Sequence, residues 1–129
     1  MEGYKVTIVS STRTLTAREK IMIKDTTPCI PLDSATSDAE GGSVDINYDF
    51  HAVLAVHNPR ATRPDYEKLV IVDKSGERYI TGSPSLREAL DNIVEEMVDA
   101  GEGDNIAIRV YRMDSNNFAG KQFLTCSLI

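Results

Sequence analysis

Tryptophan is absent from this 129-residue chain, and long apolar segments are missing as well. Apolar runs such as Leu69–Val72 are far shorter than the ~20 residues that a membrane-spanning helix needs. Residues 1–5 do not combine a basic start with an apolar stretch, so no secretory signal peptide is expected. These absences predict a cytoplasmic protein that makes no contact with membranes.

Cysteine and histidine are scarce, with two of each. Cys29 and Cys126 are far apart in the chain, and neither belongs to a Cys-x-x-Cys pair. His51 and His57 are not close to either cysteine in sequence. Because zinc sites usually draw on closely spaced Cys and His ligands, we expect two free thiols, no metal site and no cofactor.

Positive charge is also in short supply, since 14 Lys and Arg face 20 Asp and Glu and the net charge is −6. Residues 26–59 and 88–104 contain no Lys or Arg. Most of the cations fall in three groups, within residues 5–24, 60–78 and 109–121. The acidic sum argues against a surface that attracts nucleic acid everywhere. Two arrangements of the charges on the folded protein stay open: one basic face that contains all three groups, or an evenly mixed surface.

The remaining composition is that of a single globular domain over residues 1–129. With 41% hydrophobic and 26% charged residues, the chain is too apolar for disorder and too polar for a membrane protein. The segment Ser34–Ser43 is rich in Ser, Gly and acidic residues, which predicts a mobile loop.

The clearest strand pattern lies in the second half of the chain. Residues 67–72 and 77–81 are rich in β-formers and flank the turn Asp73–Gly76, which predicts a hairpin. Residues 105–112 and 121–128 alternate apolar and polar side chains, as strands do.

One long helix is predicted over residues 85–100. Ser83 and Pro84 suit the start of a helix, and Gly101 suits its end. The apolar residues between them recur at helical spacing and share one face: Leu86, Leu90, Ile93, Val94 and Met97. The other faces are acidic, so we expect this helix to pack on a sheet and to stay away from phosphates.

The first half of the chain is less clear. Residues 4–9 and 50–57 are predicted to be strands. Thr16 and Glu19 have the spacing of a capping box, which favours a short helix, but residues 20–24 fit a strand equally well.

This order of elements predicts a mainly β, α+β fold. The specific expectation is a five-stranded OB-like barrel, with the helix of about residues 85–100 between strands 3 and 4. Such barrels bind oligonucleotides around strands 2 and 3 and with the loops between strands 1–2 and 4–5. A generic α+β sheet with one helix fits the same order.

Residues 67–129 also carry a resemblance to a known family. The run Lys68–Tyr79, the acidic helix, the strand Ile106–Val110, a Gly-containing loop and the closing strand Gln122–Leu128 follow one pattern. In pattern and spacing this half of the chain resembles the single-stranded-DNA-binding proteins of small tailed phages of Gram-positive bacteria. The resemblance implies an OB fold and a protein that binds and protects single-stranded DNA, without sequence preference, during phage or prophage replication or recombination in the host cytoplasm. A homodimer and contacts with phage replication proteins stay open.

Binding a single strand without sequence preference needs cations along the phosphates and flat rings that stack on bases. Arg109 and Tyr111 share one face of their predicted strand, and Arg78 and Tyr79 must point to opposite faces of theirs. The predicted nucleic-acid-binding residues are Arg60, Arg63, Tyr66, Lys68, Arg78, Tyr79, Arg109, Tyr111, Phe118, Lys121 and Phe123. For each ring the alternative is core packing, and for each cation it is ordinary solvation.

No catalytic residue is predicted, and the chain is not expected to be an enzyme. His51 and His57 share a strand face, but no nucleophile motif or phosphate-binding Gly-rich loop accompanies them. The acidic helix face is interpreted as solvated and not as a metal site. Two other functions stay open, an acidic inhibitor that mimics DNA and binds a host protein, and a virion structural or assembly protein.

Overall fold

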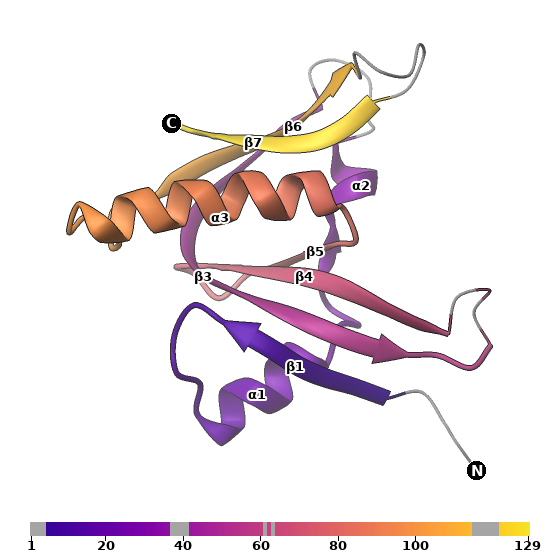
Figure 1. The fold of residues 1–129 in the computed structure, drawn as a ribbon. Coiled ribbons are helices and arrows are strands. Elements are labelled where there is room, and N and C mark those ends of the chain that lie inside the picture. Colours follow the sequence, from indigo (N-terminus) through magenta and orange to yellow (C-terminus); the bar gives the residue numbers. More distant parts are fainter. Residues whose placement is uncertain (1–4, 37–41, 61, 63, 115–121) are drawn as a thin grey trace.

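The computed structural model describes residues 5–36, 42–60, 62, 64–114 and 122–129. Its elements are, in chain order, β1 (Lys5–Ser11), α1 (Ala17–Lys24), β2 (Ile30–Pro31), α2 (Leu32–Ala35), β3 (Val44–His57), β4 (Asp65–Asp73), β5 (Arg78–Thr81), α3 (Pro84–Asp99), β6 (Ala107–Asp114) and β7 (Gln122–Leu128). The expected mainly β architecture with few helices is confirmed, as one curled mixed sheet that forms a half-barrel (Figure 1). The predicted strand number is wrong, because the described residues form seven strands and not five.

The sheet has the order β2-β5-β4-β3-β6-β7, and β1 pairs with β3 outside this path. The short strand β2 could not be read from the sequence. It consists of two residues, with Ile30 beside Tyr79 and Pro31 beside Ile80 in parallel pairing with β5. A pairing of two residues has no repeat that a sequence pattern could reveal.

Strand β3 connects the two halves of the curled sheet. Along one edge it pairs with β4 between Tyr48 and His57. Along its other edge it pairs first with β6, through Val44–Asn47, and then with β1, through residues 52–57. The predicted strand over residues 50–57 is therefore only the C-terminal part of a longer strand.

Helix α3 matches its predicted span closely and lies in the opening of the half-barrel. The side chain of Ser83 caps its start by accepting a hydrogen bond from the backbone N–H of Leu86. In Figure 1, α3 runs between β7 and the β4–β5 pair. Its buried residues share the main core with both sides of the opening: Leu86, Leu90 and Val94 from α3, Leu69 and Ile71 from β4, and Leu124 and Cys126 from β7. The helix thus fills the space between β5 and β7, which are not paired in the described part of the chain.

A second core lies on the other face of the central strands. Leu15, Ile23 and Cys29, from the N-terminal segment, pack there against residues of β3 and β4: Phe50, Ala52, Leu54, Val56, Val70 and Val72. Because both faces of these two strands are buried, long parts of them are continuous apolar runs.

The structure of the N-terminal segment can be compared with two local predictions, the short helix after Thr16 and the loop Ser34–Ser43. The capping box of Thr16 and Glu19 is formed, and the following residues are the helix α1. The predicted loop Ser34–Ser43 begins too early, because α2 extends to Ala35 and residues 37–41 lie outside the described part. No helix among the described residues has the length and apolar character needed to cross a membrane.

Candidate nucleic-acid interface

The predicted nucleic-acid-binding residues are spread over several elements. Arg63, Phe118 and Lys121 lie outside the described residues. The others are Arg60 in the β3–β4 connection, Tyr66 and Lys68 on β4, Arg78 and Tyr79 on β5, Arg109 and Tyr111 on β6, and Phe123 on β7. The structure brings Tyr66 and Lys68 together at one end of the sheet, and Arg109, Tyr111 and Phe123 onto the β6–β7 pair.

The two candidates on β5 have structural partners. Tyr79 is 9% exposed and packs in the main core, and burial raises the pKa of its hydroxyl. Arg78 points to the opposite face and donates hydrogen bonds to the carbonyl oxygens of Met22 and Asp25. Arg78 thus anchors the end of α1 to the sheet.

Arg109 on β6 is committed to a carboxylate. The register places it beside Asp45 of β3, and its Nε and Nη2 donate to the two carboxylate oxygens at 2.7 and 3.1 Å. The hydrogen bond from Arg109 is the largest effect on Asp45 and lowers its pKa. Tyr111, two residues along the same strand, shares a 2.7 Å hydrogen bond with the hydroxyl of Ser127 on β7. The β6–β7 face therefore offers rings but little free positive charge.

A hollow of about 370 Å³ lies between the start of β4 and the start of α3. We call it the β4–α3 hollow, and it is lined by Asp65, Tyr66, Glu67, Lys68, Leu69, Thr81, Gly82, Ser83, Pro84 and Arg87. The ammonium of Lys68 lies 5.7 Å from the centre of the Tyr66 ring. The start of α3 lies at the same place, where the positive end of the helix dipole favours anions, although its first residue Pro84 has no backbone N–H and the N–H of Leu86 is bound by the side chain of Ser83.

Arg87 is the cation that sequence reasoning missed. It lies between the basic groups of the sequence and belongs to the first turns of an otherwise acidic helix. Its guanidinium reaches β4 and donates to Glu67 at 2.8 Å, with both side chains partly exposed. The position just after a helix start was the available signal, because anions favour that end of a helix.

A buried polar network, also missed, joins three elements near the middle of β3. His51 contacts the hydroxyl of Tyr48 at 2.7 Å through Nδ1 and the carboxylate of Asp91 at 2.8 Å through Nε2. Thr12, which follows β1, shares a hydrogen bond of 3.2 Å with the Tyr48 hydroxyl and accepts the backbone N–H of His51. Burial lowers the pKa of His51 and raises that of Tyr48 to about 12. Asp91 is thus a partner of β3 as well as part of the solvated helix face.

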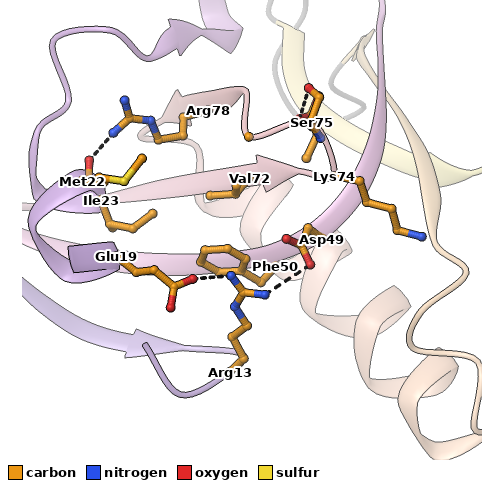
Figure 2. A pocket seen from close by; sticks show the side chains of 12 residues that line it. Arg13, Glu19, Met22, Ile23, Asp49, Phe50, Val72, Lys74, Ser75 and Arg78 are labelled. Carbon is orange, nitrogen blue, oxygen red and sulfur yellow. Dashed lines mark hydrogen bonds and ion pairs between the residues drawn. The ribbon is translucent and has the colours of Figure 1, made fainter. Parts of the chain in front are cut away.

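A second cavity, of about 390 Å³, lies between α1 and the turn that joins β4 to β5 (Figure 2). We call it the α1 groove. Ile23, Phe50 and Val72 provide apolar side chains, and the guanidinium of Arg13 lies 3.9 Å from the centre of the Phe50 ring. Arg13 also pairs with the carboxylates of Glu19 and Asp49.

Within the described ranges, no group of three or more His, Cys, Asp or Glu side chains is placed to hold a metal ion. Comparison of the chain with protein-family models, curated proteins and solved structures finds no match. The function of the chain must therefore be inferred from the chemistry of the two cavities, the β6–β7 face and the polar network around His51.

Proposed function

We propose that this protein binds single-stranded DNA without sequence preference, with the β4–α3 hollow as its main contact. The observation that carries the proposal is the hollow itself, where the ring of Tyr66, the cations Lys68 and Arg87 and the start of α3 come together. Cations that follow phosphates and rings that stack on bases are the two requirements of such binding.

The connectivity of the sheet supports this proposal. β3, β4 and β5 are consecutive antiparallel strands, and the chain then returns through α3 to place β6 beside β3. Three consecutive strands followed by a fourth beside the first make a Greek key. β3 to β7, with one helix before the fourth strand, therefore have the order of an OB barrel, to which β1, α1, β2 and α2 are additions. The open seam filled by α3 is a departure from a closed barrel.

The position of the hollow fits the same interpretation. In the proposed barrel β4 is strand 2, and the β3–β4 connection, with Arg60, is the loop between strands 1 and 2. The ends of β3, β4, β6 and β7 that carry the two corresponding connections lie on the same side of the half-barrel as the start of α3 (Figure 1). OB barrels hold oligonucleotides with these parts. The resemblance of residues 67–129 to phage single-stranded-DNA-binding proteins points in the same direction, and on that resemblance we propose a role in phage or prophage replication or recombination.

Electrostatics set the expected character of the binding. Asp65 and Glu67 line the same hollow as Lys68 and Arg87, and the whole chain carries a charge of −6. Only a few phosphates can be neutralised by Lys and Arg, so we expect modest affinity. The affinity should fall as the salt concentration rises, because binding gains less from the release of counterions.

The test is fluorescence anisotropy of labelled oligo(dT), with a duplex of equal length beside it, at low and moderate salt. We expect tighter binding to the single strand, and a loss of about fivefold to a hundredfold in Tyr66→Ala, since one stacked base contributes ~1–3 kcal/mol. Lys68→Gln should weaken binding and reduce its salt dependence. Lys20→Gln, an equal charge change on the exposed face of α1, is the matched control and should have a smaller effect.

Two results would remove the proposal. The first is no binding of oligo(dT) even at low salt. The second is equal losses in Lys68→Gln and Lys20→Gln with no loss in Tyr66→Ala, which would indicate general attraction of the polyanion and not a site in the hollow.

A further inference from the structure

Two cavities adjoin the segment that follows β1, and their charged side chains differ: one lining has both signs of charge, and the other has acids but no Lys or Arg. Arg13 lines the α1 groove, and Thr12 lines a hollow of about 460 Å³ under the C-terminal half of α3. We call the second one the acidic hollow, and its other lining residues are His51, Asp91, Val94, Glu95, Val98 and Asp99. We propose that two copies of this chain form a two-fold dimer. In it, the acidic end of α3 of each copy lies in the α1 groove of the other.

The α1 groove has the features of a receiving surface. Its apolar side chains are continued outward by Met22, which is 49% exposed, and by the exposed Ile21 on the same helix. Most of the large apolar residues of a small protein are covered, so exposed neighbours of this kind beside a cavity point to an interface.

The acidic and basic side chains around this groove differ in their partners. Glu19 and Asp49 are both paired with Arg13, and Asp73 accepts hydrogen bonds from the backbone N–H groups of Ser75 and Glu77. Lys74 and Arg78 instead donate to backbone carbonyl oxygens. Figure 2 shows Arg78 across the groove from Arg13, and Lys74 at its side with the ammonium pointing outward, towards the carbonyl oxygen of Asp104. Within the described part of the chain, these two cations have no carboxylate in an ion pair with them, and they favour an acidic partner.

The C-terminal half of α3 has the complementary chemistry. Val98 is 58% exposed, and Glu95 and Asp99 lie beside it on the same side of the helix. Residues 88–104 contain no Lys or Arg. In Figure 1 this end of α3 extends past the strands, so it is free to enter a cavity of another molecule.

The two surfaces lie close enough together to favour a closed dimer. The Nζ atom of Lys74, at the rim of the α1 groove, donates to the carbonyl oxygen of Asp104 at 2.5 Å, just after α3 ends. Two complementary patches on one side of a molecule pair reciprocally under a two-fold rotation, which is the commonest symmetry of soluble dimers. Val98 of one copy would then lie against Met22 of the other, with Glu95 and Asp99 facing Lys74 and Arg78.

Sedimentation velocity of the full chain over a range of concentrations, without DNA, tests this dimer. We expect a concentration-dependent dimer that weakens with added salt. Met22→Glu and Val98→Lys should each weaken dimerisation about tenfold or more, because each places a charge at the centre of an apolar contact. An equimolar mixture of the two variants should restore a dimer, because Glu at position 22 of one copy then meets Lys at position 98 of the other.

Met113→Glu is the matched control. This methionine is 46% exposed, nearly the same as Met22, but it lies on β6, so its substitution should leave the dimer unchanged. A wild-type chain that stays monomeric at high concentration and low salt would overturn the proposal. So would a dimer that both variants leave intact, or variants that lose it but do not restore it when mixed. Because no DNA is present, these outcomes are independent of whether the chain binds single strands.

Discussion

His51 shows what a residue can do that its sequence surroundings do not indicate. A histidine on an apolar strand without a nucleophile motif is usually a packing or surface residue, and its polar partners cannot be read from the sequence. In the structure it is 4% exposed, and its two ring nitrogens contact Tyr48 and Asp91. Because Thr12 contacts both Tyr48 and His51, this one side chain helps to hold the β1–α1 segment, β3 and α3 together. Its protonation state should therefore matter for stability.

We predict that acidification destabilises the fold through His51. Burial is the main cause that lowers its pKa below the ordinary value of 6.5, and Asp91 offsets part of the shift. At pH values between the folded pKa of His51 and 6.5, the unfolded chain binds more protons than the folded one. The contribution of His51 to stability is therefore complete above pH 6.5, and it is lost as the pH falls through the folded pKa. Urea unfolding at a series of pH values should show this loss, and His51→Asn should show a shallower dependence on pH. An identical pH dependence in the variant would contradict the prediction.

Asp45 controls how much positive charge the β6–β7 face presents. Its carboxylate holds Arg109 through two hydrogen bonds. We expect Asp45→Asn to strengthen oligo(dT) binding several-fold at low salt, because the guanidinium becomes available to phosphates. Glu96→Gln makes the same change in net charge on α3 and should strengthen binding less. Equal gains in the two variants would show that only the net charge matters.

At the scale of elements, α3 takes the place of the pairing that would close the sheet. Its apolar face touches β4 on one side of the opening and β7 on the other, and Ser85 near its start donates to the carbonyl oxygen of Leu124 on β7. This hydrogen bond satisfies one backbone carbonyl of β7, and the apolar face of the helix covers the core in the opening. Disturbing its packing should therefore affect the whole half-barrel.

Leu90→Ala tests this role of α3. Leu90 is fully buried in the main core, so its truncation leaves a cavity and should lower the free energy of unfolding by about 2–5 kcal/mol. Asn92→Ala, on the exposed side of the same helix and outside the proposed dimer contact, is the control and should have a much smaller effect. Equilibrium denaturation by urea measures both. A small loss in Leu90→Ala would mean that the half-barrel does not depend on this helix.

For the whole molecule, the structure shows how much of the described positive charge is engaged within the chain. Arg13, Arg87 and Arg109 are paired with carboxylates, and Arg78 holds α1. A DNA-binding role must then rely on a local site such as the β4–α3 hollow, and the acids of α3 remain available for contacts with protein.

The predictable part of the fold lies where patterns are local. The helix signals between Ser83 and Gly101 gave α3 to within one residue at each end, and the turn Asp73–Gly76 correctly predicted the β4–β5 hairpin. The candidate site was predicted less well. Tyr66 and Lys68 were named because they cluster around the loop before the hairpin. The place of Tyr79 in the core depends on which face of β5 meets α3, and no local pattern reveals that.

The sequence alone determined α3, most strands and the turn between β4 and β5, because these depend on spacings of two to four residues along one segment. Only the tertiary structure decided which charges remain free and where cavities lie. Arg109 meets Asp45 and His51 meets Asp91 across 64 and 40 positions of the chain, respectively. Such contacts follow from strand register and from the packing of α3 in the opening of the half-barrel, and a one-residue shift of register would turn every side chain of a strand to the other face.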